Sequence, residues 1–293
     1  MELIYNSWTE KRLSLAKQHA GSIILSGRRG SGMFHAALDL AGFFLRTEHA
    51  AEHPDLCVIG HDGDPVRKET VLEAARLSEQ EPVCGRKRVF IFDDAELLSA
   101  ECQNVLLKTL EERLLRNVFI FVTHMPLLDT VESRSVKVDF LPVPKERLTP
   151  FREIPYYASA GTPGAYRELS EDEGFCQFLG KLPKALRNRK DLFRAMGVLN
   201  EKDYKDGPFL VTAERSRQEY LLTFLTEGLR AALLNKEGCR KELPAVFAPF
   251  TEFTREKLLH MLSACESLRK TCRVAALSKA DVYIFLMKLS EEV

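Results

Sequence analysis

The chain has 293 residues with 42 basic and 42 acidic side chains, so its formal net charge is zero. That balance excludes a strongly polybasic nucleic-acid-binding protein, although it leaves room for a local basic patch. At roughly 100–200 residues per domain, the length suggests two domains and allows three. Hydrophobic residues make up 45% and charged residues 29%, which is ordinary for a globular protein.

The cysteines and the lengths of the apolar runs indicate in which cellular compartment the chain is expected. The seven cysteines form no CxxC pair, which argues against a disulfide scaffold and a cysteine-rich zinc site. No apolar run approaches the roughly 18 residues of a membrane helix, and the first residues contain no apolar signal-peptide core. A soluble cytoplasmic protein without membrane contact is expected. Trp8, the only tryptophan, is expected to pack an N-terminal helix onto the core.

Strand and helix patterns alternate through the first 140 residues. Short apolar runs rich in β-branched and aromatic side chains predict strands at 22–26, 56–59, 88–92, 118–122 and 136–140. Apolar residues at 3–4 residue spacing predict intervening helices at 34–46, 69–80 and 99–112, the last with Ser99 as N-cap. This alternation predicts βαβ units and a parallel five-stranded sheet between two helical layers. The last strand alternates with polar residues and should be less buried.

The pattern changes near residue 141, where four prolines punctuate a stretch without strand periodicity. Only helical patterns follow, and the longest lie at 216–234, 254–277 and 280–292. The C-terminal 120 residues are therefore expected to form an all-helical bundle.

A glycine-rich loop follows the first predicted strand and opens a helix, which is the context of a phosphate-binding loop. The segment GRRGSGMF starts at Gly27 and includes Gly30 and Gly32. In an active loop the next two residues are a lysine, which neutralises phosphates, and a Ser or Thr, which binds Mg²⁺. Here they are Met33 and Phe34, which supply neither group. We interpret the segment as a degenerate nucleotide site; the alternative is a plain strand-to-helix turn.

Two acidic residues end the third predicted strand. In VFIFDDAE, Asp93 occupies the position at which ATPases of this architecture hold the metal ion. Asp94 stands where they place a catalytic glutamate. The alternative is that both acids only cap the next helix.

Four further segments stand in order along the chain: HPD at 53–55, ECQNVLLKTLEE at 101–112, LDTVESRS at 128–135 and AGTPGA at 160–165. Together with the glycine loop they resemble motifs of the AAA+ clamp-loader family of bacterial DNA polymerase III, and its delta-prime branch fits best. The resemblance covers about residues 18–168. Beyond that, the chain matches the family only in being helical and of suitable length.

The resemblance implies a fold and a set of partners. It implies an AAA+ α/β core over 1–142 with a degenerate P-loop, a small helical lid over 143–172 and an all-α collar over 173–293. It also implies a non-hydrolysing subunit that joins gamma/tau and delta subunits in a hetero-pentameric ring. Such a ring loads the sliding clamp onto primed DNA. No cofactor is expected.

The resemblance further assigns one catalytic role. Arg134 matches the arginine that, in this family, reaches the ATP site of a neighbouring subunit and stabilises charge on the γ-phosphate. The alternative is a surface arginine paired with Glu132 or Asp139. Gly164 stands where hydrolysing subunits carry a sensor arginine, and Arg167 is expected to be a solvated helix residue.

Metal and nucleic-acid sites are not predicted strongly. The family's four-cysteine zinc module is missing from residues 46–55, and the seven histidines show no paired spacing, so no metal is expected. The basic run over 181–194 is interpreted as a solvated helix face, with contact to DNA phosphates as the alternative. Two other functions stay open: an ATPase with an unusual P-loop, and an AAA+-like interaction module outside replication.

Overall fold

The computed structural model describes residues 4–18, 21–60, 66–111, 116–148, 150–196, 215–239, 242–274 and 277–291. The chain divides into two compact units, Met1–Pro144 and Lys145–Val293. Each unit has its own hydrophobic core.

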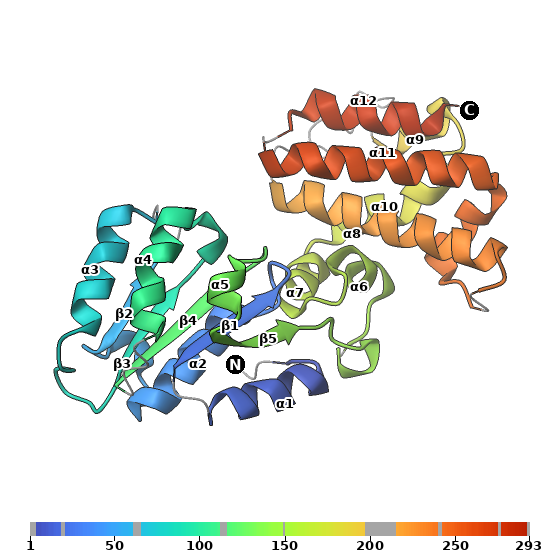
Figure 1. Ribbon diagram of the computed structural model, residues 1–293. Helices are drawn as coiled ribbons and strands as arrows, with labels where there is room; N and C mark the ends of the chain where they lie inside the picture. Colours follow the sequence, from blue (N-terminus) through green and yellow to red (C-terminus); the bar gives the residue numbers. More distant parts are fainter. Residues whose placement is uncertain are drawn as a thin grey trace. The chain divides into compact units, whose positions relative to one another are not determined.

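The first unit is built on a parallel sheet (Figure 1). Its strands are β1 (Ser22–Gly27), β2 (Leu56–Ile59), β3 (Arg88–Phe92), β4 (Asn117–Thr123) and β5 (Ser135–Phe140). They lie in the order β2-β3-β4-β1-β5, and each neighbouring pair is parallel. All five strand predictions and the parallel three-layer fold are therefore confirmed.

Helices cover both faces of this sheet. They are α1 (Ser7–Ala16), α2 (Met33–Leu45), α3 (Lys68–Ser78), α4 (Ala100–Glu111) and α5 (Asp129–Glu132), with short 3-10 helices η1 (Ala50–Glu52) and η3 (Ala95–Leu97). The Cys102 N–H donates to Ser99 Oγ over 3.2 Å, which confirms the predicted N-cap of α4. Residue 112, the predicted end of this helix, lies outside the described residues.

Alternate side chains of the central strands point to opposite faces, as the pleat requires. Ile23 and Leu25 of β1 pack with α2, whereas Ile24 packs with the phenylalanines of β3 and β4 on the other face. Stacked rings join the strands there, with centroids 4.9 Å apart for Phe90 and Phe119. Strands β3 and β4 are buried throughout, whereas β5 lies at the sheet edge and is only partly buried, as its alternating sequence predicted.

The second unit is helical throughout the part that the structure describes, which confirms the predicted helical C-terminal region (Figure 1). Its elements are η4 (Lys145–Arg147), α6 (Glu153–Ser159), α7 (Pro163–Glu171), α8 (Glu173–Ala185), α9 (Arg189–Ala195), α10 (Arg215–Lys236), η6 (Ala245–Glu252), α11 (Arg255–Val274) and α12 (Lys279–Ser290). Residues 275–276 and 292, which belong to the helices predicted over 254–277 and 280–292, lie outside the described residues, and Leu277 is not helical.

The core of this unit closes around a small residue of α10. A Cβ at Gly228 would approach the rings of Phe247 and Phe250 within 2.6 Å, so only glycine lets η6 pack this closely on α10. Phe224, one turn earlier, is fully buried and its ring centroid lies 5.1 Å from that of Phe247. The helix predicted over 216–234 is thus confirmed as α10, and Phe224 lies on the face that it buries.

The prediction for Trp8 is wrong. Its side chain is 42% exposed, with the Arg12 guanidinium 5.3 Å above the ring. Helix α1 is instead attached through Thr9, which is buried and donates to the Asp139 carbonyl over 3.0 Å. A buried hydroxyl with a backbone partner replaces the aromatic contact that composition suggested.

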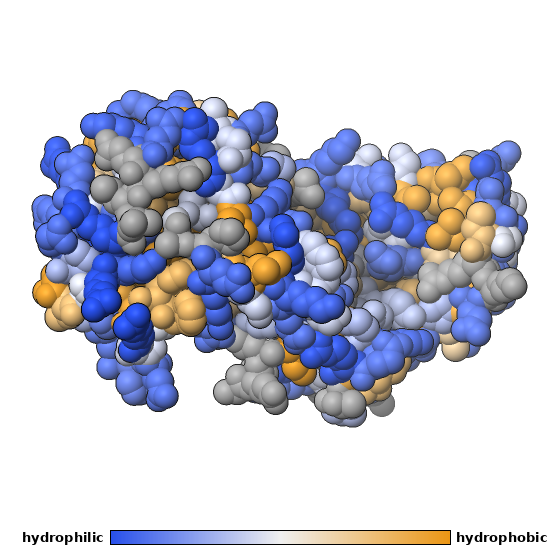
Figure 2. Space-filling view, turned by 60° about the horizontal axis from the view of Figure 1, so that its bottom comes forward, coloured by the Kyte–Doolittle hydropathy of each residue, from blue (hydrophilic) through white to orange (hydrophobic). Residues whose placement is uncertain are grey.

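No helix in the described ranges combines the length and apolar character needed to cross a membrane. On the face drawn in Figure 2, hydrophilic side chains predominate and hydrophobic ones form separate smaller patches.

Candidate functional site

The glycine loop joins β1 to α2 where the parallel strands end. We call this end of the sheet the carboxyl edge, and the end at which the strands begin the amino edge. Gly30 and Gly32 have φ of 79° and 84°, a left-handed conformation that favours glycine. A Cβ at Gly27 would lie 2.8 Å from Phe140 Cβ, so this position is restricted by a close neighbour. The loop thus forms the tight strand-to-helix turn that the sequence predicted.

The two residues that replace the lysine and the hydroxyl belong to the hydrophobic core. Met33 is only 3% exposed, and its Sδ lies 3.3 Å from where a Gly27 Cβ would stand. Phe34 is partly buried against the same cluster of side chains. Since a thioether and a phenyl ring provide neither positive charge nor a metal ligand, these side chains cannot do what a P-loop requires of them.

Tyr5 covers the loop from the N-terminal side, and sequence reasoning missed it. Its hydroxyl donates to the Gly32 carbonyl over 3.4 Å, and its ring meets Phe140 edge-to-face with centroids 5.4 Å apart. Burial, with a smaller contribution from Asp39, raises the pKa of Tyr5 far above its ordinary value, so the phenol stays protonated. Nothing in the local sequence signals this contact across 27 residues.

The two predicted acids lie at the carboxyl end of β3. Asp93 still pairs with β2, its N–H donating to the Ile59 carbonyl over 2.8 Å. Asp94 adopts a left-handed conformation with φ of 49°. Its Oδ1 lies 3.0 Å from Nη2 of Arg29, at the tip of the glycine loop. An ion pair within the chain therefore links the two segments between which a nucleotide site would lie.

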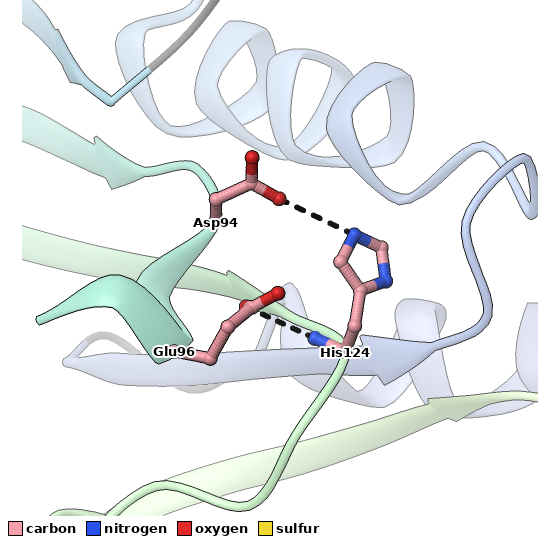
Figure 3. Close-up of side chains that lie close together, drawn as sticks. All are labelled: Asp94, Glu96 and His124. Carbon is pink, nitrogen blue, oxygen red and sulfur yellow. Dashed lines mark hydrogen bonds and ion pairs between the residues drawn. The ribbon is translucent and has the colours of Figure 1, made fainter. Parts of the chain in front are cut away.

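Two further side chains reach the same place (Figure 3). His124, directly after β4, has Nε2 3.5 Å from Asp94 Oδ1 and Nδ1 3.0 Å from the Gly27 carbonyl oxygen. Glu96, on η3, accepts the His124 backbone N–H over 3.2 Å. The parallel strand order brings these residues together, and their spacing along the chain does not signal it.

Arg134 lies just after α5 and is held by local contacts. Its Nη1 donates to the Thr130 carbonyl over 3.0 Å, and its Nη2 lies 2.7 Å from Oε1 of Glu111 on α4. Its alternative partners are otherwise engaged: Glu132 lies 3.4 Å from Lys137, and Asp139 accepts from Ser26. The guanidinium, 36% exposed, thus has a carboxylate partner from the ECQNVLLKTLEE motif.

Arg134 and the glycine loop lie at opposite edges of the sheet. Ser135 pairs with Ser22, the first residue of β1, whereas the glycine loop follows the last, Gly27. The six residues of the strand are separated by five steps of roughly 3.3 Å, so they span about 16 Å. Arg134 therefore lies too far away to serve the glycine loop of its own chain.

The remaining predicted features lie in the second unit. Gly164 is in the first turn of α7, and Arg167 pairs with Glu171 one turn on, at 3.6 Å and 62% exposed. In the basic run, Arg187 pairs with Glu252, Arg189 with Glu291 and Arg194 with Asp191. These exposed pairs favour the solvated face over a surface kept for phosphates.

Comparison with known proteins agrees with the motifs. Residues 10–144 match the family model described as DNA polymerase III, delta subunit. The chain is 31% identical to the Bacillus subtilis DNA polymerase III subunit delta' over 160 residues, 49% of this chain and 47% of that protein. It is 32% identical to the Pseudomonas aeruginosa subunit delta' over 140 residues, 41% and 43% of the two chains. The match thus spans about half the length of these curated relatives.

The fold is shared with a solved structure. A gamma subunit-related protein of DNA polymerase III from Thermotoga maritima superposes with a TM-score of 0.52 at 16% identity, covering 97% of this chain and all of that one. At that identity the likeness concerns the fold alone. The family model and the delta' relatives confirm the resemblance to these DNA polymerase III subunits over about half of the chain, and this neighbour confirms the fold.

Proposed function

With residues 10–144 matching the DNA polymerase III delta family, we propose that this chain is a delta-prime-type subunit of a bacterial clamp loader that does not hydrolyse ATP. Its partners are gamma/tau and delta subunits in a hetero-pentameric ring, which loads the sliding clamp onto primed DNA. Residues 1–142 supply the AAA+ core, 143–172 the lid and 173–293 the collar. The chain acts in the cytoplasm and needs no cofactor of its own.

The observation that carries the non-hydrolysing role is the burial of Met33. A lysine at this place must reach the phosphates, but the position faces the core and is 3% exposed. Phe34 provides no hydroxyl for Mg²⁺, and Asp94 pairs with Arg29. Three of the parts that phosphoryl transfer requires are thus replaced by apolar packing or by an internal ion pair.

The second part of the proposal concerns Arg134, which we assign as an arginine finger that acts on a neighbouring subunit. Its position at the edge opposite the glycine loop supports action in trans, because a role in its own chain would require it to cross the sheet. Its exposed pair with Glu111 is weak in water, worth about 0–1 kcal/mol, so the guanidinium can leave it for a γ-phosphate.

Equilibrium binding of a fluorescent ATP analogue to the purified full chain, with and without Mg²⁺, tests the first part. We expect no Mg²⁺-dependent binding at concentrations that saturate the gamma/tau subunit. Tight Mg²⁺-dependent binding would instead favour the ATPase with an unusual P-loop.

Reconstitution tests the assembly. The full chain is mixed with gamma/tau and delta subunits from the same organism, and the product is sized by light scattering. We expect a five-subunit complex that loads the clamp onto primed DNA. A chain that stays outside the complex would favour an interaction module unrelated to replication.

A further inference from the structure

Three potential metal ligands meet at the carboxyl edge of the sheet, and the proposed function uses only one of them, Asp94, through its ion pair with Arg29. Asp94 and Glu96 come from the start of η3 and His124 from the end of β4, and one ligand atom from each lies within 4.8 Å of the others. Figure 3 shows the side chains of Asp94 and His124 directed toward one another, with Glu96 beside them. All three are partly buried, so solvent and ions have access.

The hydrogen bond of His124 makes this arrangement informative. The Gly27 carbonyl oxygen can only accept, so its partner is an N–H at Nδ1, 3.0 Å away. Nε2 is the ring nitrogen left to bind an ion, and it lies 3.5 Å from Oδ1 of Asp94.

The geometry fits a metal ion. Zinc binds imidazole nitrogen and carboxylate oxygen at about 2.0–2.2 Å, so adjacent ligand atoms of a tetrahedral site lie about 3.4 Å apart. The Asp94–His124 separation of 3.5 Å has this length. One oxygen of the Glu96 carboxylate lies within 4.8 Å of a ligand atom of each of the other two residues, which makes it the candidate third ligand. The fourth is left for water.

The surroundings of the ligands are those of a prepared site. A ligating histidine usually donates its other ring N–H to a carbonyl or carboxylate, as His124 does to Gly27. The Thr123 hydroxyl and the His124 backbone N–H, each 3.2 Å from Glu96 Oε2, orient that carboxylate. The competing group is Arg29, which is 64% exposed and can swing away into solvent.

We infer that Asp94, Glu96 and His124 form a binding site for a divalent first-row transition metal ion of the zinc type, between β3, β4 and the glycine loop. An imidazole ligand favours zinc over Mg²⁺, which prefers oxygen ligands only. The site does not use Asp93, the residue in the Mg²⁺ position of active relatives. The ion links the start of η3 to the end of β4 at the edge that lacks the P-loop lysine, and so takes a structural role there.

Metal binding is measured on the full chain with Cys84 and Cys239, the two exposed cysteines among the described residues, changed to serine. Cobalt(II) serves as the spectroscopic probe and zinc as its competitor. We expect one equivalent of cobalt to bind with the visible bands of nitrogen and oxygen ligation, and zinc to displace it. Zinc should also raise the thermal unfolding midpoint, because it binds only the folded chain.

Variants separate the ligands from their neighbours. His124→Gln, Asp94→Asn and Glu96→Gln should each weaken zinc binding by more than about tenfold. Asp93→Asn and His35→Gln, an exposed histidine on α2, are matched controls that should leave it unchanged. Arg29→Ala should tighten binding severalfold, because it removes a competing cation.

Two outcomes would overturn the inference. One is a lack of stoichiometric cobalt or zinc binding to the full chain. The other is binding that persists in His124→Gln and does not respond to Arg29→Ala, which would place the metal elsewhere. Should His124→Gln fail to fold, the Arg29→Ala response still decides between the two.

Discussion

The two edges of the same parallel sheet carry opposite chemistry. At the carboxyl edge, the place of the phosphate-binding lysine is taken by a buried thioether, and Asp94 is paired with Arg29. At the amino edge, Arg134 keeps an exposed guanidinium on a weak carboxylate partner. Because the sheet separates the edges, one can lose nucleotide chemistry without disturbing the other.

The edges also differ in how firmly they are held. At the amino edge, Asp55 is 1% exposed and its carboxylate accepts the backbone N–H groups of Val83, Cys84 and Gly85 at 2.6–2.9 Å. At the carboxyl edge, the Arg29–Asp94 pair is open to solvent. The amino edge thus contains a buried carboxylate with three backbone donors, whereas the Arg29–Asp94 ion pair at the carboxyl edge is a weak, solvated contact. Three substitutions sharpen this contrast, and a fourth tests its functional meaning.

Met33→Lys should have the largest effect. It restores the P-loop residue but places an ammonium group in the core, which should lower the free energy of unfolding by about 3–5 kcal/mol. Met33→Leu, of similar volume, should cost less than about 1.5 kcal/mol. Urea denaturation measures both. A stable Met33→Lys that gains Mg²⁺–ATP binding would show that the site is only one residue from function.

Asp55→Asn should have the next largest effect and lower the free energy of unfolding by about 2–3 kcal/mol near pH 7. Charge-assisted hydrogen bonds are lost, and an amide N–H₂ group then faces backbone donors. Burial raises the pKa of Asp55, but the three N–H donors and Arg88 together lower it further, so the net shift is downward. A lowered pKa stabilises the fold above the unfolded value of about 3.9, and this contribution is lost as the pH falls through the folded pKa.

The penalty of Asp55→Asn should therefore shrink as the pH is lowered below about 4. Unfolding of the wild type and the variant, measured from pH 7 to pH 3, gives this dependence. A penalty that stays constant over the range would mean that the carboxylate charge does not contribute.

Arg29→Ala should have the smallest effect. Its ion pair with Asp94 is 64% exposed on the arginine side, so its loss should change stability by less than about 1 kcal/mol. Screening should make the difference smaller at high salt. A loss as large as that of Asp55→Asn would contradict the view that this ion pair is a weak, solvated contact.

Much of the first unit could be predicted from local sequence. The apolar run Arg88–Phe92 predicts a strand buried on both faces. The alternation of apolar and polar residues before Phe140 predicts a less buried strand. The missing lysine and hydroxyl of the glycine loop could be predicted because Met33 and Phe34 directly follow the glycines. Such features depend on residues that are neighbours in the chain, so their periodicity is preserved in the sequence.

The partners within the site could not be predicted in this way. Arg134 meets Glu111 across 23 residues, and Asp94 meets Arg29 across 65, because the strand order places those loops together. The prediction for Trp8 was wrong for a related reason. Its large apolar ring favours burial, but α1 is attached through the hydrogen bond of Thr9. Strand order and single hydrogen bonds leave no periodic signal.

The arginine-finger assignment is tested by the clamp- and DNA-stimulated ATPase rate of the reconstituted complex with Arg134→Ala in this chain. A finger in trans can contribute on the order of 10³–10⁵ at its own site. As only one site of the ring depends on it, the total rate should fall severalfold, with assembly intact. Arg116→Ala, a control that removes another ion-paired arginine beside the amino end of β4, should leave the rate unchanged. An unchanged rate with Arg134→Ala would show that Arg134 does not act as an arginine finger on a neighbouring subunit.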